Sequence, residues 1–496
     1  MTPFPHLKTT VPALVALGVG GCMVGPDYER PDLETPAELR YEDKATQERM
    51  SAQWWAAYDD PELTALIETA TEANPDIGAA LARVDRAAAS VGVARSELFP
   101  QVDFFTEAVR QRSSGNQTQP YGDASTRNNF SSALGLAWEL DVWGRVRRLS
   151  ASALAEAQAQ ADAYGYAVVL VQTMVGQQYF EIRTLDQRIE FLERTVKGRR
   201  ESLDLVEVRR SSGLADDLEF FQARTEWSIA RSELEGFRRR RALAENALAI
   251  LLGAYPSDFS VSADPDWVPY LPPSPGAVPS TLLERRPDLA QAENLVRAAS
   301  ERIGARTAEY FPRIMITGDV GFSAADAGNW FTRSSLFGSL GPSVSMPVFN
   351  AGRVASQVDE AKAEYRELLE FYRGQVLTAF REVEDALAAL ETLRHQIAAQ
   401  RDAATDARSA ADLAQQRYEN GLVNYLEVVD TERTALNNAL ILAELENALY
   451  ARQLDLIRAL GGGWTRPDLD SLDDTEALKN SLLNAAPPQP SEQDLK

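Results

Sequence analysis

The chain has 496 residues, a formal net charge of −23 and an ordinary apolar content of 45%. This length allows two or three domains with a sizeable core, and the acidic balance argues against a nucleic-acid partner, because phosphate contacts need a basic face. One cysteine and two histidines exclude a disulfide within the chain and argue against a zinc site. No apolar run reaches the length of about 18 residues that predicts a transmembrane helix.

The beginning of the chain resembles an export signal. Lys8 precedes a short apolar run from Val11 to Gly21, and Cys22 follows it directly. The run has the length of a signal-peptide h-region and ends in small residues. A cysteine at this place is typical of a bacterial lipoprotein, whose thiol carries the lipid. The alternative is a lone cysteine buried in a core. We predict a signal peptide over residues 1–21 and lipidation of Cys22.

A helix and two strands are predicted after a polar, proline-punctuated arm over residues 22–60. From Pro61 to Leu98 apolar residues recur every three or four positions, which predicts one helix that Pro100 ends. Two segments with period-two alternation follow, from Val102 to Ala108 and from Phe130 to Leu140. Each is about ten residues long, the length of a tilted β-strand that crosses a bilayer.

A very long helical pattern comes next, over residues 145–210. At about 1.5 Å per residue it spans on the order of 100 Å, more than a globular domain accommodates. A turn at Gly213 then leads into a helix over residues 217–252. On that helix we interpret the basic run 238–241 as a solvated face.

The same order of elements then occurs a second time. The first repeat covers residues 61–255, a proline-rich link covers 256–283, and the second repeat covers 284–463. In the second repeat we expect a helix ending near Tyr310, strands over 314–322 and 336–348, a long helix from Arg353 and a helix over 425–460. A polar tail over residues 464–496 is predicted to be partly disordered. The chain is therefore predicted to be an internal duplication.

The turns after the two long helices are equivalent points of this duplication. Gly213 and Gly421 each supply the left-handed position that ends the long helix. At the second turn, Asn424 and Glu427 have the spacing of a capping box that opens the final helix.

The strand count requires more than one chain. Four strands leave two open edges, which lipid does not tolerate. Small closed barrels need about eight strands, so at least two chains must contribute. Small residues on several helix faces also suit lateral contact with neighbouring helices.

Several motifs in chain order resemble the lipoprotein branch of the TolC-like outer-membrane efflux proteins. They are Cys22 to Tyr28, Arg286 to Leu289, Phe311-Pro312, Gly421 to Asp430 and Leu460 to Trp464. The resemblance covers nearly the whole chain. It implies an α+β membrane protein: a homotrimer with one twelve-stranded antiparallel β-barrel, a twelve-helix α-barrel and a small mixed equatorial domain. It also implies outer-membrane lipid, a periplasmic adaptor and an inner-membrane RND-type transporter as partners, with no cofactor and no metal.

The resemblance places a gate just after the second turn, where rings of side chains close the periplasmic end in that family. Leu426 and Asp430 match those positions, with Tyr418 and Arg433 nearby. Glu419 stands where relatives often carry a basic residue, so a resting salt bridge is not carried over. The residues alone allow another interpretation, in which Leu426 packs and Asp430 lies favourably near a helix N-terminus and pairs with Arg433.

The resemblance also implies that the adaptor docks at the two turns. The residues at these positions are Ser212, Gly213, Asp216, Asp217, Asn420, Gly421 and Asn424. Asp216 and Asp217 could each be a helix cap, an adaptor contact or both, and capping is favoured for Asp216.

The function implied is a passive outer-membrane channel of an efflux pump, opened at its periplasmic end. The alternative within this class is the outlet of a type I protein secretion system. No nucleophile elbow, phosphate loop or metal-binding spacing is present in the sequence, so we expect no catalytic residues and no enzyme. A purely structural coiled coil would explain the long helices but neither the strands nor the lipidation motif.

Overall fold

The computed structural model describes residues 23–33, 36, 38–41, 51–114, 126–267, 270–274 and 284–466. The predicted signal peptide, Cys22 and most of the predicted tail lie outside these described residues. Within them the helices and strands follow one another twice in the same order, which confirms the predicted duplication.

The elements have the bounds that the residue patterns predict to within a few positions. The first repeat, with the short helix before it, contains η1 (Trp54–Tyr58), α2 (Pro61–Ala73), α3 (Pro75–Ser96), β1 (Gln101–Arg112), β2 (Thr126–Leu140), α4 (Arg145–Ser211) and α5 (Asp217–Leu251). The second contains α7 (Pro287–Ala308), β3 (Arg313–Ala324), η2 (Ala327–Asn329), η3 (Arg333–Ser335), β4 (Leu336–Ser345), α8 (Arg353–Glu419) and α9 (Tyr425–Ala459).

One predicted helix is in fact two. The prediction of a single helix from Pro61 to Leu98 is wrong at Asn74, where the backbone leaves the helical region with φ −67° and ψ 126°. The residue before a proline is driven out of the helical region, and Pro75 then begins the new helix. The Asn74 side chain accepts hydrogen bonds from the backbone N–H groups of Asp76 (2.8 Å) and Ile77 (3.2 Å). It therefore caps α3, as asparagine commonly does.

The four strands form one antiparallel sheet in the order β1-β2-β3-β4. In its register Phe104 lies opposite Leu134, and Leu134 lies opposite Val320. Directly opposed residues share a face of the sheet, so the apolar faces predicted from period two all fall on one side. In the described part of the chain, β1 and β4 each pair along one edge only, and most of their side chains are exposed.

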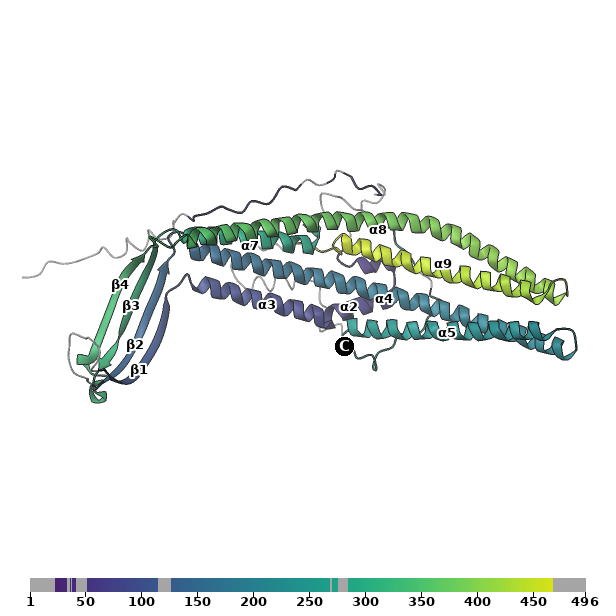
Figure 1. Cartoon of the computed structure of the whole chain (residues 1–496), viewed down its shortest axis with the longest axis horizontal. Coiled ribbons are helices and arrows are strands. Elements are labelled where there is room, and N and C mark those ends of the chain that lie inside the picture. The colour runs from purple at the N-terminus through teal and green to yellow at the C-terminus, as the bar shows by residue number, and fades with distance from the viewer. Residues whose placement is uncertain are drawn as a thin grey trace, which may run out of the picture.

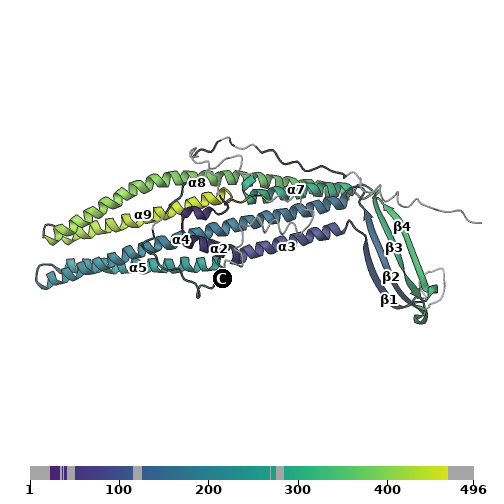
Figure 2. The ribbon, with the colours of Figure 1, turned by 180° about the vertical axis from the view of Figure 1, so that it is seen from behind.

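The helices extend from one end of the sheet as a long assembly (Figure 1). α3, α2 and α5 lie in succession along α4, whereas α7 and α9 lie along α8; the view from behind shows the same arrangement (Figure 2). Contacts of α4 with α7 and α9 join the two repeats. None of the helices in the described ranges combines the length and the apolar character that a membrane span needs.

An aromatic core lies where the arm and the link meet both repeats. The Phe180 ring on α4 is centred 5.2 Å from Tyr58 of η1 and 4.7 Å from Tyr450 of α9. Trp267 of the link packs 5.9 Å from Phe180. Burial of these large rings stabilises this level of the molecule.

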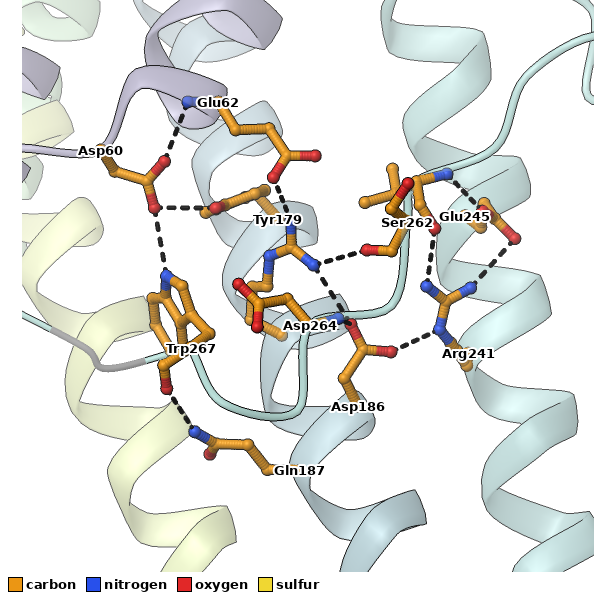
Figure 3. Close-up of polar contacts among 12 residues, drawn as sticks. Asp60, Glu62, Tyr179, Asp186, Gln187, Arg241, Glu245, Ser262, Asp264 and Trp267 are labelled. Atoms are coloured by element: carbon orange, nitrogen blue, oxygen red, sulfur yellow. Dashed lines mark hydrogen bonds and ion pairs between the residues drawn. The ribbon is translucent and has the colours of Figure 1, made fainter.

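A buried polar network fastens the link to the helices beside this core (Figure 3). Asp186 of α4 accepts from the guanidinium groups of Arg183 (3.2 Å) and Arg241 (2.5 Å), and from the backbone N–H of Asp264 (3.2 Å). Arg183 in turn donates to the Ser262 carbonyl oxygen (2.8 Å). The carboxylate and its two cations are therefore paired and hydrogen-bonded, as buried charges must be.

The interpretation of residues 238–241 as a solvated face is wrong for Arg241. Its side chain is 16% exposed and also binds the Val261 carbonyl oxygen (2.8 Å), whereas Arg238 is 47% exposed and pairs with Glu193 (2.7 Å). Four consecutive residues point around a helix, so one of them must face the packed side.

Candidate functional site

Both turns lie at the same end of the helical assembly, opposite the sheet (Figures 1 and 2). One joins α4 to α5 and the other joins α8 to α9. We call this end the tip. An apolar cluster joins the four helices here: Leu203, Val206, Ala223, Ala414, Tyr418, Tyr425, Val428 and Val429.

The first turn ends α4 and caps α5 with its own side chains. Gly213 has a φ of +71°, and the Leu214 N–H closes the turn on the Arg209 carbonyl oxygen (2.8 Å). The Asp216 carboxylate accepts from the Glu219 N–H (2.9 Å), so the predicted cap is present. Asp217 pairs instead with Arg210 of α4 (2.6 Å). Beside them the Ser212 hydroxyl donates to the Val208 carbonyl oxygen (3.0 Å).

The second turn repeats this geometry. Gly421 has a φ of +73°, and the Asn420 amide donates to the Gln416 carbonyl oxygen (2.7 Å). The Asn424 side chain accepts from the Glu427 N–H (3.2 Å), which is one half of the predicted capping box. The Glu427 carboxylate pairs with Arg417 (3.5 Å) in place of the reciprocal bond.

Tyr418 lies inside the tip and is only 2% exposed. Its ring is centred 5.4 Å from Tyr425 and beneath the Arg209 guanidinium, and its hydroxyl contacts Glu219 (3.4 Å). Burial raises the pKa of the Tyr418 hydroxyl, and the nearby Glu219 carboxylate adds to this. Tyr418 therefore packs the two hairpins together and does not face an aperture within this chain.

Leu426 and Asp430 lie on one face of α9 and are both exposed, with Leu426 56% accessible. Within the described residues, the Asp430 carboxylate makes no hydrogen bond or ion pair. Glu419 is also exposed and accepts a hydrogen bond from Gln415 of its own helix (2.9 Å). The structure thus brings Leu426 and Asp430 together and leaves their face open.

Arg433 does not pair with Asp430, which contradicts that alternative. Its guanidinium binds the carboxylate of Glu226 on α5, in the other repeat. Glu226 also contacts Arg199 of α4 (3.3 Å), and the Arg199 guanidinium lies 4.0 Å from Glu432. Burial raises the pKa of the Glu432 carboxyl, against the opposing effect of Arg199.

A groove of about 790 Å³ lies between the two hairpins at the height of these charged residues. Residues of α4, α8 and α9 line it, among them Arg199, Glu419 and Glu432. Beside this groove the Arg433–Glu226 pair is a direct polar contact between the two hairpins.

The prediction from apolar periodicity missed Glu226 and Arg199, although the sequence contained a signal that both are buried. Each is a charged residue within a buried apolar stripe, Glu226 between Ala223 and Ala230 and Arg199 before Leu203. A charge at such a position indicates a buried partner, although nothing local says which one. In the described residues no group of three or more histidine, cysteine, aspartate or glutamate side chains is placed to hold a metal ion.

Comparison with known proteins agrees with this geometry. The family model described as "Outer membrane efflux protein" matches residues 66–254 and 278–462. Outer membrane protein OprJ of Pseudomonas aeruginosa is 33% identical over 462 residues, which are 91% of this chain and 95% of that protein. Cation efflux system protein CusC of Escherichia coli O157:H7 is 30% identical over 461 residues, 92% of this chain and 98% of that protein.

Solved structures share the fold. The outer-membrane channel OprN superposes with a TM-score of 0.83 at 29% identity, over 90% of this chain and all of that one. The CmeC outer membrane channel of Campylobacter jejuni superposes with a TM-score of 0.85 at 23% identity, over 93% of this chain and 99% of that one, which supports the fold alone.

Long helices that continue from a membrane-length antiparallel sheet, in two repeats, define a TolC-like channel protein. This chain belongs to the outer membrane efflux protein family. It is the outer-membrane channel of an efflux pump, not an enzyme, and it extends from the bacterial outer membrane into the periplasm.

Proposed function

We propose that three copies of the chain form one continuous passive tunnel, with a twelve-stranded β-barrel in the outer membrane and a twelve-helix α-barrel in the periplasm. The support is that one chain, over its described residues, has two edges without a neighbour, both in its sheet and in its layer of helices. β1 and β4 are the edge strands, and α3 and α8 lie on the corresponding outer sides of the helical layer. Unpaired strand edges are not tolerated in lipid, so neighbouring copies must complete the sheet.

The apolar face of the sheet is the face that we propose contacts lipid. Exposed apolar residues recur along it in register, including Phe104, Leu134, Val320, Leu340 and Val344. Alternation of apolar and polar residues is typical of strands between lipid and an aqueous lumen. The aromatic core around Phe180 would form the equatorial domain.

Lipidation of Cys22 would add a second attachment to the same membrane. The support comes from the residues directly after it. Met23 packs on Gly144, and the Val24 N–H binds the Trp143 carbonyl oxygen (3.1 Å), at the junction of sheet and helices. The arm therefore starts at the membrane side of the helices. The intact mass of the mature chain checks this: a thioether-linked lipid is expected in the native protein and none in Cys22→Ala.

The gate lies at the tip, formed by Leu426 and Asp430 of three chains around one axis. Leu426 narrows the aperture, and three neighbouring carboxylates repel one another and favour binding of a cation. The observation that carries this assignment is the asymmetry of the duplication. Both turns lie at the tip, yet only the second turn is followed by a leucine and an aspartate at these positions. The equivalent residues after the first turn are Leu218 and Gln222.

The gate is tested by Leu426→Ala combined with Asp430→Ala, measured as single-channel conductance in planar bilayers. We expect higher conductance than in the native protein, because the shorter side chains make the aperture wider. The matched control is Leu218→Ala with Gln222→Ala on the first turn. Conductance that stays unchanged in the Leu426/Asp430 variant contradicts the gate.

The turns at the tip are proposed to receive the periplasmic adaptor, which connects the tunnel to an inner-membrane RND-type transporter. Exposed leucines flank the docking residues named above: Leu214, Leu218 and Leu422 are between 63% and 71% exposed. Exposed apolar side chains grouped at one end of a molecule are typical of a protein contact.

Small molecules are the proposed cargo. The names of similar proteins refer to solvent, toluene, antibiotic and cation efflux. A deletion strain is expected to lose resistance to at least one of these classes in a susceptibility panel. Normal resistance together with loss of an exported protein from the medium would favour the type I secretion alternative instead.

A further inference from the structure

The contact between the two hairpins above the tip centres on one buried carboxylate. Glu226 of α5 is 3% exposed in its side chain, and it lies between Arg199 of α4 and Arg433 of α9. Arg199 is equally buried and donates to the Glu226 backbone carbonyl oxygen (3.0 Å). Glu226 therefore has one cation from its own hairpin and one from the other repeat.

We propose that Glu226 sets the charge of the gate by withholding Arg433 from Asp430. This inference rests on the proposed function, in which Asp430 lines the aperture. Glu226 is a positioning residue, because it acts on the permeating ion only through Arg433.

Arg433 has two carboxylates within reach and is paired with only one of them. Asp430 and Arg433 are three residues apart on α9, a spacing at which an acid and a base can pair. Arg433 turns instead to Glu226, and the hydrogen bond to that carboxylate is the main cause that raises the pKa of Arg433. Leaving a carboxylate buried with fewer cations is costly, so Glu226 holds Arg433 more strongly than the exposed Asp430 can.

The consequence is a carboxylate at the aperture that Arg433 does not bind. The Asp430 carboxylate makes no hydrogen bond or ion pair among the described residues, so the proposed trimer presents three unpaired carboxylates at the gate. If Glu226 is made neutral, Arg433 loses its partner and lies beside the positive charge of Arg199. Its side chain is 55% exposed and can turn. It is then expected to pair with Asp430.

The test compares cation selectivity in four variants, measured as the reversal potential of single channels in planar bilayers under a KCl gradient. We expect Asp430→Asn to shift the reversal potential toward zero, and Glu226→Gln to shift it in the same direction. Arg433→Gln is expected to leave it at the native value, because Arg433 does not neutralise Asp430. Glu226→Gln with Arg433→Gln is expected to restore the native value, because no guanidinium remains to pair with Asp430.

Each outcome separates this inference from the proposed gate. No shift in Asp430→Asn contradicts the gate itself. A shift in Asp430→Asn without one in Glu226→Gln overturns the role of Glu226. Greater cation selectivity in Arg433→Gln also overturns it, even if Glu226→Gln does not assemble, because Arg433 would then neutralise Asp430 in the native protein. The matched control is Glu235→Gln on the same helix, whose carboxylate pairs with the exposed Arg238 (2.8 Å).

Discussion

Asp162 is a buried acid between the two repeats. It lies on α4 and is 1% exposed; one carboxylate oxygen accepts from the Asn294 amide of α7 (2.7 Å), and the other has no hydrogen-bond partner. Burial raises the pKa of Asp162 to about 7, although the Arg466 guanidinium and the Asn294 bond oppose the shift. Protonation of this side chain therefore contributes to the stability of the contact between α4 and α7.

The pH dependence of stability follows from this shift. The folded pKa of Asp162 lies above the unfolded value of about 3.9, so its contribution to stability is fully present below about pH 4 and is lost as pH rises through 7. Asp162→Asn removes this loss. We expect Asp162→Asn to have a higher melting temperature than the native protein at pH 8. The corresponding gain in the free energy of unfolding is on the order of 4 kcal/mol at most, and both differences are expected to shrink at pH 5.

Thermal unfolding at both pH values checks this prediction. Glu235→Gln serves as the exposed control and is expected to change little at either pH. An Asp162→Asn effect of equal size at pH 5 and pH 8 would contradict the titration of Asp162.

At the scale of elements, the network around Asp186 connects three segments that no local pattern joins. α4 provides Asp186 and Arg183, α5 provides Arg241, and the link provides backbone groups of residues 261–264 (Figure 3). The link therefore has a fixed place beside the aromatic core, although its own sequence is proline-rich and irregular.

Asp186→Ala tests this connection. It removes the carboxylate that Arg183 and Arg241 share, whereas Arg183 keeps Glu62 and Arg241 keeps Glu245 as partners. Breaking a buried pair costs about 3–5 kcal/mol, and the remaining partners make this an upper value. We expect a clear loss in the free energy of unfolding and faster proteolysis within residues 256–267. Arg238→Ala, which breaks an exposed pair, is expected to cost at most about 1 kcal/mol. Equal effects of the two substitutions would show that the Asp186 network does not hold the link.

At the scale of the whole molecule, a single chain is incomplete. In the described part of the chain the sheet ends in two exposed edge strands, β1 and β4. These edges cannot remain unpaired in lipid, since each unpaired backbone group there costs several kcal/mol.

Particle mass in detergent tests the proposed assembly. We expect three chains per particle after correction for bound detergent, and the mass is expected to persist on dilution because every chain has two edges to close. Particles of one or two chains would contradict the homotrimer.

The sequence determined the elements and their order because the forces that fix them are local. Apolar periodicity set the lengths of α4 and α8, and alternation set the faces of the strands. The turns followed from Gly213 and Gly421, whose φ angles of +71° and +73° other residues rarely adopt. The break at Asn74 also has a local cause, because the residue before a proline is driven out of the helical region. The prediction missed it because the apolar periodicity continues across the Asn74-Pro75 pair.

Only the tertiary structure decided which charges meet. Arg433 has Asp430 three residues away, yet it binds Glu226, from which 207 residues of chain separate it. Arg241 pairs with the buried Asp186, although its neighbours in the basic run are more exposed. Tyr418, which the resemblance placed near the gate, is buried in the core of the tip. A buried carboxylate needs a cation more than an exposed one does, and burial is a property of the packed helices. The sequence alone therefore located the tip, and the packing of the two repeats determined which charges pair there.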